Sequence, residues 1–479
     1  MTISKDENWQ SGRAGTTEVY KDNDGQQVLR RVYNLTGSTL QQLSTYYVYD
    51  DLGNLSFVLP PGSMPDAGLP TQATLDNLGF QYQYDSRNRL VQKKIPGKGW
   101  EYLIYNAIDQ VVATQDANQR ALSQWVYTKY DAMGRVVLTG LYSSTSTRPA
   151  LQSVVDGQAI FWETPVSTSS SGGGYTSAAW PVNAAYFLTI NYYDTYTIAG
   201  LPIAYSAPST SSLNTRSLLT ASQTNILGTT NMLWMVPYYD DLGRIILSYQ
   251  QHNQGGGATL STGNYDLIKN QYNFSNQDTA TTRQHYNVVI SKTAAAITVV
   301  NSYVYDHLGR KRQTWETING GTKVHLSQLD YNELGQPMTK HLHSETGIAP
   351  FLQDVGYTYN ERGWLRTQGN SSNLFSLDLR YNTADNGTTQ QYNGNIAEML
   401  YMGTNSGAKT FQYQYDPLNR LTSGVSTGNT MNEAVSYDLM GNITSLTPLG
   451  SAAAVLAYTY QNGGLSNQLQ AVTKGGDSV

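Results

Sequence analysis

The residues of this chain that could do chemistry are its few histidines and a series of regularly repeated aspartates. His341 and His343 stand two residues apart, so a strand would place both on one face. Two imidazoles could supply half of a zinc site, but no third ligand is evident, and solvent-facing histidines are the favoured interpretation. The repeated aspartates could bind Ca²⁺, yet their motif lacks the dense oxygen spacing of a calcium loop. The sequence therefore predicts no metal and no cofactor.

No catalytic constellation stands out in the rest of the sequence. The chain contains no cysteine, which excludes thiol catalysis, disulfides and Cys-ligated metal sites. Nucleotide-binding Gly loops, Ser-His-Asp spacing and paired carboxylates do not rise above background. The basic stretch at 93–100 is more typical of a solvated turn than of an anion site. We therefore expect a protein that is not an enzyme.

One heptad accounts for the repeated aspartates. It consists of Tyr-Asp, two variable residues, Gly or Asn, Arg or Asn, and usually an apolar residue. From Tyr305 onward, successive motif tyrosines, looser copies included, stand 22 to 33 residues apart. The seven strict copies contribute these predicted structural turn residues: Tyr49, Asp50 and Gly53; Tyr84, Asp85 and Asn88; Tyr130, Asp131 and Gly134; Tyr239, Asp240 and Gly243; Tyr305, Asp306 and Gly309; Tyr415, Asp416 and Asn419; Tyr437, Asp438 and Gly441.

The heptad has the chemistry of a β-hairpin turn. The residues before each Tyr favour strands, and Asp suits the first position of a type I turn, where its carboxylate accepts backbone N–H groups. Two residues follow in right-handed conformation, and the next must adopt positive φ to rejoin the ladder. That position holds Gly, or else Asn88 or Asn419, and Asn is the next-best residue there. Each heptad therefore predicts a tight turn between two strands.

Composition points to the same fold class. Tyr makes up 37 of the 479 residues, and charged residues are only 14%. Tyr favours strands because its ring packs on a pleated surface while its hydroxyl reaches water. A propeller is the alternative all-β repeat fold, but its blades recur about every 40 residues, roughly twice the step seen here. We expect an all-β ribbon of hairpins, curved into a partial shell.

The spacing of the motifs divides the chain into three parts. Repeats are dense over 1–140 and again over 233–479, whereas 141–232 contains no strict copy. We interpret 141–232 as diverged repeats that carry an insertion rich in Ser, Thr and Gly. Within it, the stretch at 167–177 predicts a flexible loop.

Charge and hydropathy limit the partners. The net charge is −5, which does not build the positive surface that nucleic acid requires. The longest apolar runs, such as 294–300 and 452–458, are too short to insert into a membrane. The first ten residues, MTISKDENWQ, do not form a signal peptide.

These motifs resemble the YD repeat of Rhs proteins. The chain looks most like the Rhs proteins of Bacteroidetes, and more distantly like Tc-toxin shell subunits and teneurins. The runs that carry the resemblance include KKIPGKGWEYLIYNAIDQVVATQDANQR at 93–120 and KYDAMGRVVLTGLY at 129–142, together with YNERGWLRTQ and YQYDPLNRLTS.

The resemblance implies a structural role. Such proteins form long β-ribbons that spiral into a hollow shell, and in toxin members the shell holds a variable C-terminal effector. This sequence ends at GGDSV without the core and effector segments of that pattern, so we expect a piece of a longer exported protein, extracellular or at the cell surface. Its partner would be its own C-terminal effector. The alternative is a cell-surface adhesion or carbohydrate-binding protein whose tyrosines stack on glycans.

Overall fold

The computed structural model describes residues 1–166, 172–253, 260–291, 294–345, 347, 349–370, 374–384, 387–404, 407–429, 431–449, 455–475 and 477–478. The strands and the turns between them dominate these residues. The α-helices among them are short: α1 (Gln72–Leu78), α2 (Ala117–Ala121) and α3 (Arg148–Asp156). The predicted all-β fold is confirmed.

The chain forms two compact units. We call Tyr102–Asp354 the central unit, and Met1–Glu101 with Val355–Val479 the terminal unit. The terminal unit therefore combines two arms from opposite ends of the sequence.

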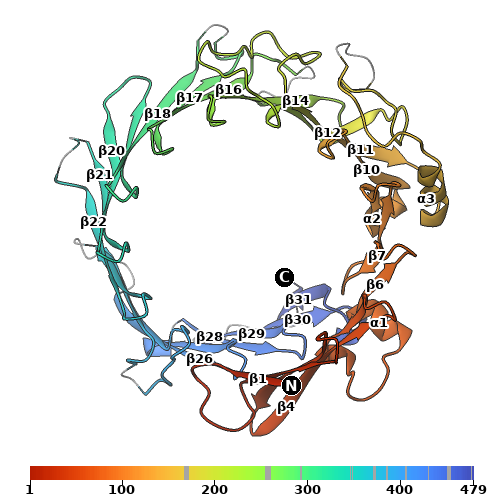
Figure 1. Ribbon diagram of the computed structural model, residues 1–479. Coiled ribbons are helices and arrows are strands. Elements are labelled where there is room, and N and C mark those ends of the chain that lie inside the picture. Colours follow the sequence, from red (N-terminus) through yellow and green to blue (C-terminus); the bar gives the residue numbers. More distant parts are fainter. Residues whose placement is uncertain are drawn as a thin grey trace. The chain divides into compact units, whose positions relative to one another are not determined.

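In the central unit each strand pairs antiparallel with the next along the chain. In Figure 1 these strands follow one another along an arc. They are β8 (Glu101–Tyr105), β9 (Val111–Gln115), β10 (Gln124–Tyr130), β11 (Val136–Ser143), β12 (Tyr186–Tyr193), β13 (Leu219–Asn225), β14 (Met232–Tyr239), β15 (Ile245–Gln251), β16 (Tyr265–Tyr272), β17 (Asp278–Tyr286), β18 (Ile297–Tyr305), β19 (Lys311–Ile318), β20 (Val324–Tyr331) and β21 (Pro337–Ser344).

The two arms of the terminal unit follow the same antiparallel pattern. The N-terminal arm contains β1 (Thr2–Lys5), β2 (Thr16–Lys21), β3 (Gln27–Thr36), β4 (Thr39–Tyr49), β5 (Leu55–Leu59), β6 (Phe80–Tyr84) and β7 (Leu90–Lys94). The C-terminal arm contains β22 (Gln353–Tyr359), β23 (Leu365–Asn370), β24 (Phe375–Arg380), β25 (Glu398–Gly403), β26 (Gly407–Tyr415), β27 (Leu421–Ser426), β28 (Asn432–Tyr437), β29 (Ile443–Leu449), β30 (Leu456–Tyr460), β31 (Leu469–Lys474) and β32 (Asp477–Ser478).

The order of the strands gathers the motif turns. Successive connections in such a meander alternate between the two ends of the strands. Every strict motif joins an even-numbered strand to the following odd-numbered one, as in β4–β5, β14–β15 and β18–β19. The motif turns of each unit therefore line up at the same ends of the strands, along one side of the sheet, and we call this line of turns the turn row.

The core of the central unit lies between the sheet and the segment that interrupts the repeats. Trp125, Tyr127 and Val137 on the sheet are fully buried, in one cluster with Leu151 and Val155 of α3. β12, β13 and β14 continue the ladder between α3 and Tyr239. The segment 141–232 thus contributes both strands and a cover over one face.

The prediction of a flexible loop at 167–177 is wrong for residues 172–177. Residues 167–171 lie outside the described residues. Tyr175 is buried, and its hydroxyl donates to the Asn191 carbonyl at 2.6 Å. A Cβ on Gly173 or Gly174 would stand 2.7 Å from Ile190 or 3.0 Å from Tyr192. The glycines are there because only a bare backbone can approach the sheet this closely.

We predict that the fifth motif position requires a residue that tolerates positive φ, and Gly243 is the position at which to test this. Its φ is +75°, and a Cβ there would meet nothing within 4 Å, so steric crowding does not complicate the result. Gly243→Val should lower the free energy of unfolding by about 1–2 kcal/mol, because a β-branched residue is strained at positive φ. Denaturant melts measure this change.

Gly243→Asn is the matched control and should be clearly milder, since Asn88 and Asn419 already occupy this position with φ of 58° and 63°. Equal tolerance of Val and Asn would contradict the turn assignment.

Candidate functional site: the turn row

Each motif aspartate is committed to its own turn. In the turn of Asp240, Oδ1 accepts the backbone N–H groups of Leu242 at 2.9 Å and Arg244 at 3.0 Å. Oδ2 accepts Nε of Arg244 at 2.7 Å. Burial tends to raise the pKa of Asp240, but these hydrogen bonds outweigh it and hold the pKa below its ordinary value. The same arrangement, with Arg as the partner, recurs at Asp85, Asp131, Asp306 and Asp416.

The arginine of one motif also contacts the tyrosine of the next hairpin. The Arg244 guanidinium lies over the Tyr272 ring, 4.7 Å from its centroid. The Tyr272 hydroxyl donates to the carbonyl of Ile245, the residue after that arginine, at 2.8 Å. The stacking recurs in three further pairs: Arg135 over Tyr193, Arg310 over Tyr331, and Arg420 over Tyr437.

The tyrosine hydroxyl bond is the commonest link between hairpins. The acceptor is a carbonyl at or near the start of the strand that follows the preceding turn. The bond therefore fixes the spacing between one turn and the next. Among the strict copies in the described residues, Tyr305 alone shows no such bond. The pairs, donor first, are Tyr49 and Gln27, Tyr84 and Leu55, Tyr130 and Val111, Tyr193 and Val136, Tyr239 and Leu219, Tyr331 and Lys311, Tyr381 and Leu365, Tyr415 and Ile396, Tyr437 and Leu421, and Tyr460 and Ile443.

Side chains also join neighbouring turns directly. Gln277 Nε2 donates to the Gly309 carbonyl at 3.0 Å, and Arg244 donates to the Asn276 side chain at 2.8 Å. The sequence pattern predicts the tyrosines at strand ends but does not predict these bonds between hairpins. The signal was present, because Arg follows the Gly or Asn position in five of the seven strict copies.

In most of the motif turns whose third residue is apolar, that residue faces outward. Leu242, Leu308 and Leu334 in the central unit are 70%, 64% and 85% exposed. Ile108 and Met133 occupy the same position and are also exposed. A row of large apolar side chains at one edge of a sheet is a feature of surfaces that contact other protein.

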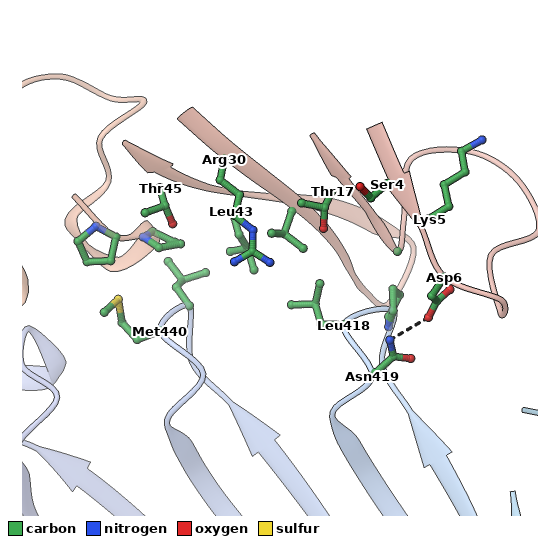
Figure 2. Close-up of a pocket in the computed structure, with 16 residues that line it drawn as sticks. Ser4, Lys5, Asp6, Thr17, Arg30, Leu43, Thr45, Leu418, Asn419 and Met440 are labelled. Carbon is green, nitrogen blue, oxygen red and sulfur yellow. Dashed lines mark hydrogen bonds between the residues drawn. The ribbon is translucent and has the colours of Figure 1, made fainter. Parts of the chain in front are cut away.

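In the terminal unit two residues at this position are covered. Leu418 and Met440 lie beneath the N-terminal arm (Figure 2). The backbone N–H of Gly62 contacts the Met440 sulfur at 3.2 Å, and Asp6 accepts a hydrogen bond from the Asn419 side chain at 2.8 Å. The turn row therefore serves as a docking edge within this chain.

The prediction of two solvent-facing histidines is wrong for His341. Its side chain is 19% exposed and bridges Asp330 and Asp354, with Nε2 2.8 Å from the Asp330 carboxylate. His343 has φ of 54°, which breaks the regular alternation of the strand, and it is more exposed. Burial tends to lower the pKa of His341, but the hydrogen bonds to Asp330 and Asp354 outweigh it and raise the pKa above its ordinary value.

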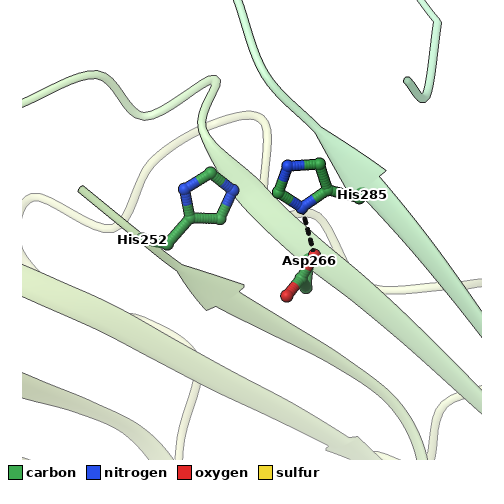
Figure 3. A group of neighbouring side chains, drawn as sticks. All are labelled: His252, Asp266 and His285. Atoms are coloured by element: carbon green, nitrogen blue, oxygen red, sulfur yellow. Dashed lines mark hydrogen bonds and ion pairs between the residues drawn. The ribbon is translucent and has the colours of Figure 1, made fainter. Parts of the chain in front are cut away.

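A second histidine cluster could be considered as a metal centre. The ligand atoms of His252, Asp266 and His285 lie within 4.8 Å of one another (Figure 3). The two imidazole rings, however, are stacked with their planes 10° apart. A nitrogen lone pair lies in its ring plane, so nearly parallel rings cannot both point at one ion. Arg283 also pairs with Asp266 at 2.6 Å and would repel a cation.

One fully buried ion pair fastens the insertion to the sheet. Lys129 Nζ on β10 lies 2.8 Å from Glu163 Oε1, and the two side chains are 2% and 0% exposed. Glu163 also accepts hydrogen bonds from the Thr176 hydroxyl and from the backbone N–H groups of Ala178 and Ala179. Burial lowers the pKa of Lys129 more than the bond to Glu163 raises it. With every partner supplied by neighbouring residues, the pair is a structural anchor.

We predict that removing one tyrosine hydroxyl weakens the fold measurably. Tyr239→Phe loses the 2.7 Å bond to the Leu219 carbonyl at a buried position. The expected loss is about 1 kcal/mol of unfolding free energy, measured in denaturant melts. Tyr303→Phe is the control, because its hydroxyl has no hydrogen bond to the part of the chain that the structure describes. Equal losses in both variants would rule out the proposed link between hairpins.

We also predict a pH-dependent contribution from His341. Because its folded pKa is raised, protonated His341 stabilises the protein fully below the unfolded pKa of about 6.5, and the contribution fades as pH rises through the folded pKa. His341→Gln should therefore cost about 1 kcal/mol near pH 5.5 and progressively less at higher pH. Unfolding free energies across this pH range test it, with exposed His307→Gln as control. A pH-independent difference would contradict the prediction.

Comparison with known proteins gives a result at the level of the fold. No protein-family model matches the chain, and no curated protein matches it. Among the described residues, no helix has the length and hydropathy needed to span a membrane.

Solved structures, by contrast, match over almost the whole chain. The crystal structure of TcdB2-TccC3-Cdc42 matches with a TM-score of 0.62 and 12% identity, over 94% of this chain and 20% of that one. TcdB2-TccC3 without its hypervariable C-terminal region matches with a TM-score of 0.62 and 13% identity, over 95% of this chain and 20% of that one. The Tc holotoxin pore of Photorhabdus luminescens matches with a TM-score of 0.61 and 12% identity, over 93% of this chain and 19% of that one. This chain thus spans about a fifth of the length of the matched chains, and it shares the fold of a β-ribbon found in Tc toxins.

Proposed function

We propose that this chain is a non-catalytic wall segment of an exported Rhs/YD-repeat protein, which encloses or presents a C-terminal toxin effector outside the producing cell. The linking runs between the motifs support a place among the Rhs proteins of Bacteroidetes. The chain would supply a rigid surface and no turnover of its own.

The observation that carries the proposal is the part of the Tc structures that the chain resembles. The TM-score is 0.62 both for TcdB2-TccC3-Cdc42 and for TcdB2-TccC3 without the hypervariable C-terminal region. The likeness therefore does not depend on that variable region. We infer that this chain corresponds to the constant ribbon and that the cargo would be a separate segment.

The chemistry of the turn row supports the same role. Motif carboxylates, guanidiniums and hydroxyls bind one another along the ribbon, so few are available for a substrate. The exposed tips Leu242, Leu308 and Leu334 occupy the positions that β1–β4 and the loop after β5 cover at Leu418 and Met440. We infer that further wall covers them in the parent protein.

Carbohydrate binding is less well supported. Sugar stacking needs exposed aromatic faces, but among the tyrosines that the structure describes only Tyr392 is exposed, at 41%.

The test uses the parent reading frame, expressed with and without the region that encodes this chain. If the chain is part of a container, the downstream domain should resist protease and should be less toxic when the wall is present. A wall weakened by Gly243→Val together with Gly309→Val should lose that protection, whereas the matched Asn substitutions should retain it. Both glycines have positive φ, at 75° and 82°.

Equal protease sensitivity and toxicity with and without the wall would refute containment. Binding of the isolated chain to a glycan array would then favour adhesion.

A further inference from the structure

A cleft opens in the terminal unit where the N-terminal arm crosses the turn row. Its volume is about 560 Å³, within the range of pockets that hold small ligands. The strands β2, β3 and β4 form one wall, and the turns at 417–419 and 439–440 form the opposite wall (Figure 2). Residues from both ends of the sequence therefore line a single site.

The strand wall carries polar groups on one face. Arg30 lies opposite Thr45 in the register of β3 and β4, and Val32 lies opposite both Thr17 and Leu43. Since alternate residues of a strand share a face, Arg30 and Val32 line the cleft together. Figure 2 shows the Arg30 guanidinium extending from β3 toward the opposite turns.

The Arg30 guanidinium has no partner of its own. The Arg30 backbone pairs with β2 and β4, but the side chain makes no ion pair or hydrogen bond with the part of the chain that the structure describes. Asp6 is the one acidic residue in the lining, and its carboxylate accepts hydrogen bonds from Asn419 and from the backbone of Asn8. Lys5, the other cation, lies with Nζ 3.3 Å from the ring centroid of Trp9. A guanidinium therefore remains available in the cleft.

The surroundings of this guanidinium are largely apolar. Leu43, Leu418 and Met440 line the cleft together with Pro60 and Pro61. Two hydroxyls lie on the same wall, that of Thr45 opposite Arg30 and that of Thr17 opposite Val32. A guanidinium without a partner, on the same wall as two hydroxyls and facing apolar side chains, matches an anionic head attached to an apolar body.

We propose that this cleft is a binding site for a carboxylate that carries an apolar body. The guanidinium of Arg30 holds the carboxylate, with Thr17 and Thr45 beside it, and the body packs on Leu418 and Met440. Such a ligand contacts both arms of the terminal unit, so binding stabilises their junction. This site is independent of the proposed wall function, because it requires neither a cargo nor a longer chain.

Two probes test the site and separate its two sources of carboxylate. Octanoate represents a free aliphatic acid, and acetyl-Leu-Leu with a free carboxyl end represents a peptide terminus. Isothermal titration and thermal melts of the full chain should show binding of at least one probe, with a raised melting temperature. Octanol and the peptide amide lack the charge and should bind at least tenfold more weakly. The tighter of the two acids identifies the source.

The variants assign the binding to this cleft. Arg30→Gln should weaken binding on the order of tenfold, and Arg30→Lys should weaken it less, since Lys keeps the charge without the bidentate fork. Lys21→Gln on β2 is the control and should bind like the unmodified chain. If the melting temperature of Arg30→Gln without ligand differs from that of the unmodified chain, Thr45→Val serves as a second variant, because it is nearly isosteric. Thr45→Val should bind the acids severalfold more weakly than the unmodified chain does.

Two results would overturn the proposal. One is the absence of binding by both acids at 20 mM, roughly the weakest affinity that a single charge-assisted contact would give. The other is binding that is the same in the unmodified chain, in Arg30→Gln and in Thr45→Val.

Discussion

The pairing of a motif aspartate with the arginine four residues later is the interaction on which the ribbon depends. The carboxylate closes its own turn through backbone N–H groups and holds the guanidinium at the turn edge, as Asp240 does with Arg244. That guanidinium lies over the ring of Tyr272 in the next hairpin, whose hydroxyl binds the carbonyl of Ile245. One partly buried network thus sets the shape of a turn and its distance to the next turn. A ribbon of short strands, each contributing little alone, becomes stable because such contacts repeat.

This arrangement also sets the protonation states of motif aspartates and buried tyrosines. Charge-assisted hydrogen bonds hold the pKa of Asp306 below its ordinary value against the opposing effect of burial. Burial raises the pKa of Tyr238 to about 12. Groups held in these protonation states are poor general acids or bases near neutral pH. These side chains therefore serve the structure of the ribbon, and the proposed ligand site lies where two pieces of ribbon meet.

The terminal unit shows one such meeting. β1–β4 and the loop after β5 lie over turn tips that are more than 350 residues away in the sequence, for example where Gly62 contacts Met440. The contact partly covers apolar tips that are exposed elsewhere, and because the two surfaces do not interlock completely it leaves the cleft around Arg30. Packing of an edge against a face thus generates both the docking interaction and the proposed ligand site.

The sequence by itself determined the strands, the turns and their positive-φ residues, because these follow from local chemistry. Asp, Gly and Asn within seven residues specify a turn wherever it lies in the fold, so the all-β ribbon followed from residues such as Asp240 and Gly243. Only the tertiary structure decided which tyrosine meets which carbonyl, that Tyr175 packs against the sheet, and that His341 lies between Asp330 and Asp354. Those contacts join residues from different strands, and strand pairing brings them together. The cleft required the most distant pairing of all, since Arg30 and Met440 share it only because the two ends of the chain fold into one unit.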